Sequence, residues 1–182
     1  MELGHYPAIQ NMFRHPVCHP ERGLAADEPL VNATATAYRN AYIAARRAVA
    51  GAADLLPLVK ARAKVGIVSN NLLDEQQEKL RQCALEGFVD ALVVSEEIGV
   101  SKPDQAIFRV ALERLGCGAE DAVMVGDSWA ADVVGARAAG IRAIWFNRHG
   151  LPSPDPCAGV QEIRALGPAE SVMRILFGSH RH

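Results

Sequence analysis

Three short polar clusters in this 182-residue sequence carry side chains that could handle a phosphate group or a metal ion. The strongest is Gly126-Asp127-Ser128, followed by Asp132 five residues after Asp127. Two carboxylates that converge on one point suit a hard cation such as Mg²⁺, which prefers oxygen ligands. The alternative is that these acids only favour a helix N-terminus, with Asp132 solvated. The pair by itself leaves these two interpretations evenly matched.

The second cluster is Ser101-Lys102-Pro103-Asp104. Lys102 could neutralise a phosphoryl group or a neighbouring carboxylate, and Asp104 could cap the helix that follows. A loop lysine is more often a solvated surface charge, and this is the favoured interpretation for Lys102 taken alone.

The third cluster, Ser69-Asn70-Asn71, ends an apolar run. The Ser69 hydroxyl and the backbone amides of Asn70 and Asn71 could hold a phosphoryl oxygen. The commoner role of such residues is to begin a turn and cap a helix. This cluster is therefore also ambiguous when it is taken alone.

The elements that must position these clusters alternate regularly after Gly51. Continuous apolar segments predict buried strands at 65–69, 91–94, 123–127 and 143–146. Helical periodicity predicts helices at 33–49, 55–63, 74–85, 107–115 and 130–139, and a last helix from Pro168 to near Phe177. Apolar strands separated by helices predict an α/β, Rossmann-like fold, in which helices cover both faces of a parallel sheet.

Ligands in such sheets bind beyond the carboxyl ends of the strands. Ser69 and Asp127 each end a predicted strand, and Lys102 lies in a loop before a helix. The fold prediction thus becomes a site prediction, with all three clusters at one edge of the sheet.

The order and setting of the clusters resemble a known family. Val65-Gly66-Ile67-Val68-Ser69-Asn70, then Ser101-Lys102-Pro103-Asp104, then Val125-Gly126-Asp127-Ser128 with Asp132 are similar to motifs two, three and four of the haloacid dehalogenase-like (HAD) hydrolases. The resemblance covers roughly residues 51–150, and the stretch 33–49 resembles the last part of the helical cap that follows the family's first motif. It implies a fragmentary cap with an irregular segment in residues 1–50, and a core domain in 51–182.

The resemblance implies Mg²⁺-dependent hydrolysis of a small phosphorylated metabolite through an aspartyl-phosphate, as in the nucleotidase and phosphoglycolate-type phosphatases. Ser69 and Lys102 would be the catalytic residues, and with Asn70 they would bind the phosphate. Asp127 would bind the metal, with Asp132 in support. A dehalogenase is less favoured, because the acidic pair suits the phosphatase branch.

The family's first motif, Asp-x-Asp-x-Thr or Val at the end of a first strand, has no match. Its first aspartate is the nucleophile. Before Ser69 the only aspartates are Asp27, which no apolar strand precedes, and Asp54, which lies in a predicted helix. The resemblance places the first strand between the strands of motifs two and four, so its absence predicts two facing, unpaired sheet edges.

Three explanations stay open. The favoured one is a truncated product of a longer gene. The second is a short relative that binds phosphate or metal without turnover, or serves as an interaction protein. The third is an assembly, in which a second copy or another chain donates the strand. In each case the chain as it stands is expected to be inactive.

Composition excludes several other classes of protein. A net charge of −2 gives no basic field for nucleic acid, and no apolar stretch reaches the roughly 20 residues that cross a membrane. Scattered cysteines without a CxxC pair favour reduced thiols in a cytoplasmic protein.

Two further features have modest interpretations. His15, Cys18 and His19 could suggest zinc, but a structural zinc site needs more ligands than this cluster offers, and a flexible loop is favoured. Trp129, beside Asp127, could line a substrate entrance or cover the core.

Overall fold

The computed structural model describes residues 28–178, which form parts of two compact units, Met1–Arg47 and Ala48–His182. The suggested zinc residues His15, Cys18 and His19 lie outside the described residues, as does Asp27. No helix within the described range has both the length and the hydropathy needed to span a bilayer.

The described part of the first unit is the helix α2 (Glu28–Ala45). It begins and ends a few residues earlier than the predicted 33–49. Pro29 is compatible with this early start, because proline is tolerated in the first turn of a helix.

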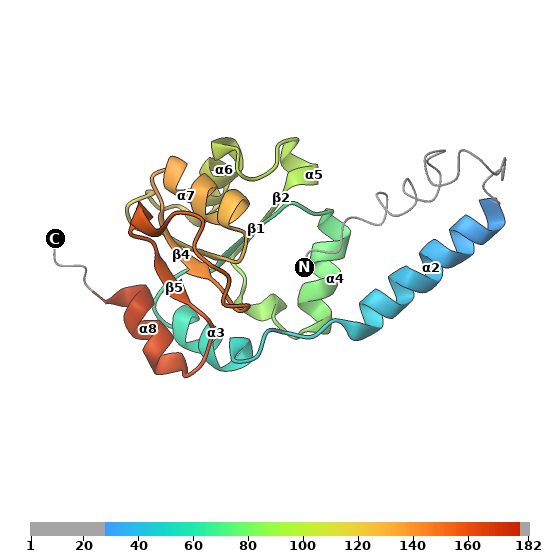
Figure 1. The fold of residues 1–182 in the computed structure, drawn as a ribbon, viewed down its shortest axis with the longest axis horizontal. Coiled ribbons are helices and arrows are strands. Elements are labelled where there is room, and N and C mark those ends of the chain that lie inside the picture. The colour runs from blue at the N-terminus through green and yellow to red at the C-terminus, as the bar shows by residue number, and fades with distance from the viewer. Residues whose placement is uncertain (1–27, 179–182) are drawn as a thin grey trace. The chain divides into compact units, whose positions relative to one another are not determined.

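The second unit alternates strands and helices along the chain (Figure 1). Its strands are β1 (Gly66–Ser69), β2 (Ala91–Val94), β3 (Val123–Gly126), β4 (Arg142–Phe146) and β5 (Gln161–Ile163). Its α-helices are α3 (Ala52–Lys60), α4 (Leu73–Gln82), α5 (Ser95–Ile98), α6 (Gln105–Leu115), α7 (Gly135–Ala138) and α8 (Ala169–Phe177). Every strand pair is parallel. The predicted α/β fold with a parallel sheet is therefore confirmed.

The structure also departs from the prediction in places. The segment predicted as one helix over 130–139 begins with a π-helical turn, Trp129–Val134, before α7. The backbone N–H groups of Asp132 and Val133 both point to the carbonyl oxygen of Ser128, which widens this turn. Strand β5 was not predicted, because three residues are too short for a periodic pattern.

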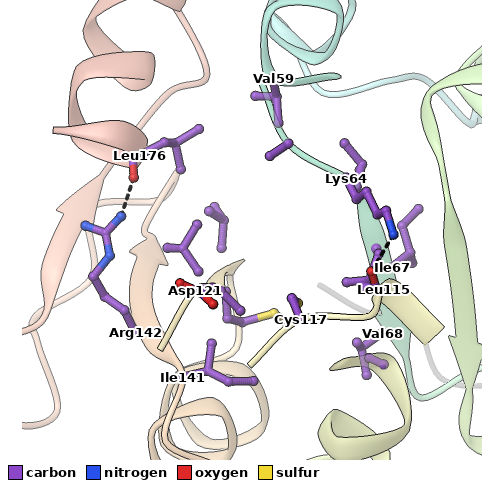
Figure 2. A pocket seen from close by; sticks show the side chains of 18 of the residues that line it. Val59, Lys64, Ile67, Val68, Leu115, Cys117, Asp121, Ile141, Arg142 and Leu176 are labelled. Atoms are coloured by element: carbon purple, nitrogen blue, oxygen red, sulfur yellow. Dashed lines mark hydrogen bonds between the residues drawn. The ribbon is translucent and has the colours of Figure 1, made fainter. Parts of the chain in front are cut away.

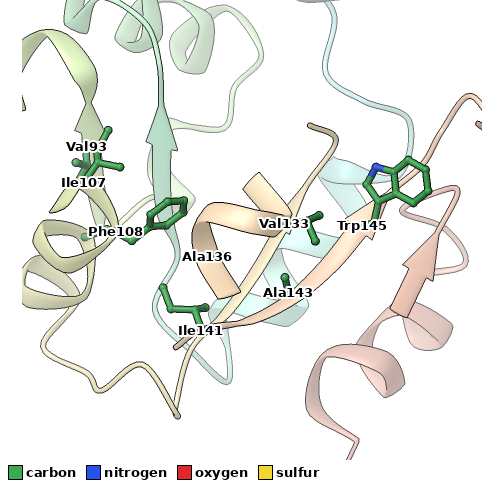
Figure 3. Close-up of a cluster of buried hydrophobic side chains, with 9 residues drawn as sticks. Val93, Ile107, Phe108, Val133, Ala136, Ile141, Ala143 and Trp145 are labelled. Carbon is green, nitrogen blue, oxygen red and sulfur yellow. The ribbon is translucent and has the colours of Figure 1, made fainter. Parts of the chain in front are cut away.

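Strand β4 shows how both faces of the sheet are buried. Ala143 and Trp145 pack into a cluster with Ile107 and Phe108 of α6 (Figure 3). Ile144 and Phe146, on the opposite face, join a second cluster with side chains from α3, β5 and α8. This alternation follows from the two-residue period of a strand, and it explains why β4 reads as one continuous apolar run.

The strands form two separate sheets, β1-β2 and β3-β4-β5. Within residues 28–178, β1 pairs only with β2, and β3 pairs only with β4. Helices link the two sheets, since α6 packs against β1, β2 and α7, and α3 packs against α8. Among the described residues, β1 and β3 therefore each keep one edge without a strand partner, and the absence of the family's first strand stays a prediction.

A cavity of about 870 Å³ lies between the two sheets. Figure 2 shows Ile67 and Val68 of β1 on one side of it, and Ile141, Arg142 and Leu176 on the other. Most of its lining is aliphatic. The space is partly open, so solvent can enter it.

Candidate functional site

Lys102 and Asp132 form a buried ion pair at the carboxyl edge of the sheets. The Lys102 Nζ lies 2.6 Å from Oδ1 of Asp132, and only 9% and 6% of the two side chains are exposed. The interpretation of Lys102 as a solvated surface charge is therefore wrong, as is that of Asp132 as a solvated acid. Since each charge has lost most of its water, each depends on the other for stabilisation.

The end of β1 fixes the backbone around Lys102. The Asn70 side chain donates to the Lys102 carbonyl oxygen at 3.0 Å and accepts from the Lys102 N–H at 2.7 Å. On the other side, the Asp104 carboxylate accepts from the Ala106 N–H at 2.8 Å and caps α6, as predicted. The lysine is thus held by both neighbouring elements before any ligand binds.

Asp132 lies against the backbone that carries Asp127. Its Oδ2 accepts a hydrogen bond of 3.0 Å from the Ser128 N–H. A Cβ atom added to Gly126 would lie 2.4 Å from the Asp132 carboxyl group, closer than real Cβ atoms approach. Glycine at position 126 is therefore what allows the second acid of the motif to reach this position.

Asp127 itself faces solvent, with 49% of its side chain exposed. Its carbonyl oxygen accepts a hydrogen bond of 3.1 Å from Trp145 Nε1. Trp145 packs edge-on against Trp129, with their ring centroids 5.2 Å apart. Trp129 therefore covers the core, one of its two interpretations, and the tryptophan pair holds the Asp127 backbone in place.

Arg148 was missed in the sequence, although it follows β4 at the same edge. Its guanidinium lies 3.7 Å from the Asp127 carboxylate. The preceding Asn147 is only 2% exposed, and its side chain bonds both the N–H and the carbonyl oxygen of Leu151. The signal that could have identified Arg148 is its position just after a predicted strand end.

Ser69 is less strongly fixed. Its hydroxyl lies 3.4 Å from Oε1 of Gln76 on α4, which is a long hydrogen bond. Because this hydrogen bond is weak, a ligand could replace Gln76 as the partner of the Ser69 hydroxyl. The structure links Asn70, Lys102 and Asp132 directly, and Ser69 ends the same strand that positions Asn70.

Of the two carboxylates at this edge, one is available to bind Mg²⁺. Mg²⁺ often binds through one or two carboxylates and keeps several waters. Asp127 offers an accessible carboxylate, whereas both oxygens of Asp132 already accept hydrogen bonds. No group of three or more His, Cys, Asp or Glu side chains suited to a metal occurs within residues 28–178. Asp127 would therefore be the direct ligand and Asp132 a support.

The described residues supply no evident nucleophile for this edge. Asp54 lies exposed within α3, as predicted, so it does not resemble an acid at a strand end. The arrangement offers a cation, a hydroxyl group and a carboxylate at one edge. These groups can bind a phosphate dianion and offset its charge.

Comparison with known proteins shows which family the sequence matches. Residues 26–146 match the haloacid dehalogenase-like hydrolase family. The chain is 36% identical to pyrimidine 5′-nucleotidase YjjG of Escherichia coli over 124 residues, which are 68% of this chain and 55% of that protein. It is 39% identical to phosphoserine phosphatase of Thermus thermophilus over 112 residues, 59% of this chain and 45% of that protein.

Among solved structures, the magnesium-bound crystal structure of YfnB from Bacillus subtilis matches with a TM-score of 0.74 and 28% identity. The match covers 96% of this chain and 73% of that one. The chain spans about half the length of these two curated relatives, the nucleotidase and the phosphoserine phosphatase.

Proposed function

Because the chain belongs to the haloacid dehalogenase-like hydrolase family, we propose that its edge site binds the phosphate group of a small phosphate monoester together with Mg²⁺. The observation that carries this proposal is the buried ion pair between Lys102 and Asp132, fixed by Asn70 from a neighbouring strand. A lysine side chain is seldom buried to this extent unless its ammonium group is paired with an acid or takes part in function. The site is the phosphate-binding part of a phosphatase.

Each side chain would have a distinct role. The Ser69 hydroxyl would donate to a phosphoryl oxygen, and the N–H of Asn70 would add a second donor. Lys102 would offset the negative charge that develops on the phosphate during transfer. Asp132 would keep the Lys102 ammonium at this point through their 2.6 Å contact.

Asp127 would hold the metal ion, and its exposed carboxylate supports this role. When bound, Mg²⁺ would neutralise phosphate charge and orient a phosphoryl oxygen. The YfnB structure, which contains magnesium, supports Mg²⁺ as the kind of metal ion. The nucleotidase and phosphoserine phosphatase relatives support a small phosphate monoester as the substrate class.

Hydrolysis through an aspartyl-phosphate requires a carboxylate nucleophile, and residues 28–178 offer none at the edge. We therefore propose that this chain alone binds phosphate without turnover. The alternative is a protein that only binds phosphate or metal. The intact Lys102–Asp132 pair favours phosphate binding under both proposals.

The test combines binding with turnover. Titration calorimetry would measure inorganic phosphate binding in the presence of Mg²⁺, and p-nitrophenyl phosphate would report hydrolysis. Binding should be lost in Lys102→Met and retained in Lys79→Met, which removes a lysine of α4. Equal phosphate binding by both variants would contradict the proposed site. Turnover by the unmodified chain that Asp127→Ala abolishes would reveal a nucleophile outside the described residues.

We also propose a cytoplasmic location. Cys83, Cys117 and Cys157 are free thiols, which a reducing compartment preserves.

A further inference from the structure

The turn that follows β4 is closed by one buried side chain, that of Asn147, which is only 2% exposed. Its amide group donates to the Leu151 carbonyl oxygen at 2.8 Å and accepts from the Leu151 N–H at 2.9 Å. The backbone N–H of Asn147 bonds the Ile163 carbonyl oxygen of β5 at 2.8 Å, and its carbonyl oxygen accepts from the Gly150 N–H at 3.1 Å. Residues 147–151, which we call the Asn147 turn, are therefore fixed both to each other and to the sheet.

The Asn147 turn carries an arginine whose hydrogen-bond donors are not engaged. Arg148 lies 3.7 Å from the Asp127 carboxylate, which is too long for a hydrogen bond, and 39% of its side chain is exposed. Arg114, by contrast, bonds both carboxylate oxygens of Glu97 through its two terminal nitrogens. A guanidinium group has five N–H donors in a planar fork that matches a carboxylate or a phosphate group. Arg148 is thus placed by its turn, yet no residue within 28–178 forms a hydrogen bond with its side chain.

Lys102 and Arg148 lie on either side of the two acids of the edge site. The Lys102 ammonium contacts Oδ1 of Asp132, and Oδ2 of Asp132 accepts from the Ser128 N–H. Arg148 contacts Asp127, which directly precedes Ser128 in the chain. The two cations therefore contact different acids of the same motif. A phosphate group that binds at Lys102 leaves Arg148 for a different anionic group.

Metal binding would release Arg148 from Asp127, and this step rests on the proposed function. A carboxylate that coordinates Mg²⁺ places the ion beside the guanidinium, and the two positive charges repel each other. The Asn147 turn meanwhile keeps the backbone of Arg148 at the edge of the sheet. The side chain then exchanges the Asp127 carboxylate for water or for an anionic group of the ligand.

We infer that Arg148 is a specificity-determining residue, which binds a second anionic group, a carboxylate or a phosphate, on the leaving group of the phosphate monoester. Both groups present negatively charged oxygens that fit the guanidinium fork. The preferred substrates are therefore phosphate monoesters that carry a second acidic group, rather than phosphate monoesters of neutral alcohols.

The experiment measures binding to the full chain by titration calorimetry, with Mg²⁺ at a concentration that saturates each variant. The ligands share one carbon chain and differ at its far end: propyl phosphate, 3-(phosphonooxy)propanoate and propane-1,3-diyl bisphosphate. The readout is the dissociation constant of propyl phosphate divided by that of each charged ligand. In the unmodified chain this ratio should reach about three to five for the better charged ligand, the upper range for an exposed ion pair. For the bisphosphate this gain comes on top of a statistical factor of about two, since its phosphates are equivalent. The two charged ligands show whether the second group is a carboxylate or a phosphate.

Two arginine variants locate the effect. Arg148→Gln should lower the ratio to about one for the carboxylate ligand and to the statistical factor of about two for the bisphosphate. Arg164→Gln is the matched control, because it removes an exposed arginine that follows the neighbouring strand β5 and pairs with Glu162. This control should keep the ratio of the unmodified chain.

The outcomes separate this inference from the proposed function. A ratio in the unmodified chain no higher than that expected for Arg148→Gln, or a high ratio that Arg148→Gln leaves unchanged, would overturn the inference. An equal loss in Arg164→Gln would show a general effect of net charge and would overturn it as well. In each of these cases, binding of propyl phosphate that Lys102→Met abolishes would leave the proposed function intact. If the unmodified chain binds none of the ligands, both proposals fail.

Discussion

Lys102 and Asp132 are almost completely removed from water, and this makes their pairing different from a surface ion pair. Exposed pairs contribute ~0–1 kcal/mol, but removing one member of a buried pair leaves the other as an uncompensated charge. The effect of substitution at this pair should therefore be large, and it should depend on which side chain remains.

Lys102→Met is expected to lower the free energy of unfolding by about 3–5 kcal/mol, because Asp132 stays buried without its cation. The double variant Lys102→Met/Asp132→Asn should recover most of this loss, since no unpaired charge remains. Urea unfolding of the two variants and the wild type measures both effects. A double variant as unstable as the single one would show that the lost packing of Lys102 dominates.

Gly126→Ala tests the close contact between the strand end and Asp132. The added Cβ would meet the carboxyl group at 2.4 Å, so Asp132 must move. We expect a loss of about 1–3 kcal/mol in unfolding free energy, together with weaker phosphate binding through a displaced Lys102. Gly87→Ala is the matched control, because a Cβ atom there meets nothing within 4 Å. Similar losses at both positions would contradict the contact.

Arg148 competes with a metal ion for Asp127. Its guanidinium lies 3.7 Å from the carboxylate and repels a cation that approaches it. Arg148→Gln should therefore bind Mg²⁺ more tightly, by roughly 1.4- to fivefold, as expected for an exposed ion pair worth ~0.2–1 kcal/mol. Arg164→Gln, which alters a separate exposed pair with Glu162, serves as the control in the calorimetric titration. Unchanged or weaker Mg²⁺ binding by Arg148→Gln would argue against Asp127 as the ligand.

At the scale of the elements, Asp90 connects the end of α3 to the start of β1. Its carboxylate pairs with Lys60 of α3 and accepts a hydrogen bond of 2.7 Å from the Val65 N–H. The hydrogen bond from Lys60, followed by that from Val65, lowers the pKa of Asp90 below its ordinary value of 3.8. One side chain thus aligns the helix that precedes β1 with the strand itself.

The lowered pKa of Asp90 gives a pH-dependent prediction. Since the folded pKa lies below the unfolded one, the stabilisation is present above the ordinary value of 3.8 and is lost as pH falls through the lower folded pKa. Asp90→Asn should be less stable than the wild type at pH 7, and the two should converge at strongly acidic pH. Thermal unfolding of both proteins, measured from pH 7 down to strongly acidic pH, checks this convergence. A constant difference at every pH would exclude the charge as the cause.

The elements also show what the sequence could predict. Strands β1 to β4 are continuous apolar runs, so burial on both faces made them visible. The π-helical turn depends on hydrogen bonds to Ser128, and the burial of Lys102 depends on Asn70 and Asp132, which lie about thirty residues away on either side. Such contacts between distant segments leave no periodic signal. The site residues were therefore predictable by type and strand position, but their pairing was not.

At the scale of the whole molecule, the cavity determines which positions can accept a larger side chain without a loss of stability. Val125 lines the cavity, whereas Val133 is 1% exposed within a packed cluster. Val125→Leu should raise the unfolding free energy by up to about 0.8 kcal/mol, the value of one buried methylene. Val133→Leu should lower it by about 1–3 kcal/mol through overpacking. Chemical denaturation compares them directly, and destabilisation of similar size in both would show that the cavity is already filled.

The two open edges of β1 and β3 also affect how the protein behaves in concentrated solution. A row of amide and carbonyl groups without strand partners, beside half-buried aliphatic side chains, is a template for any extended chain, including partly unfolded copies of the same protein. Self-association should therefore grow steeply with protein concentration and with temperature. A ligand that fills the space between the strands would act as a solubilising agent, and yield on expression would become a simple measure of its occupancy.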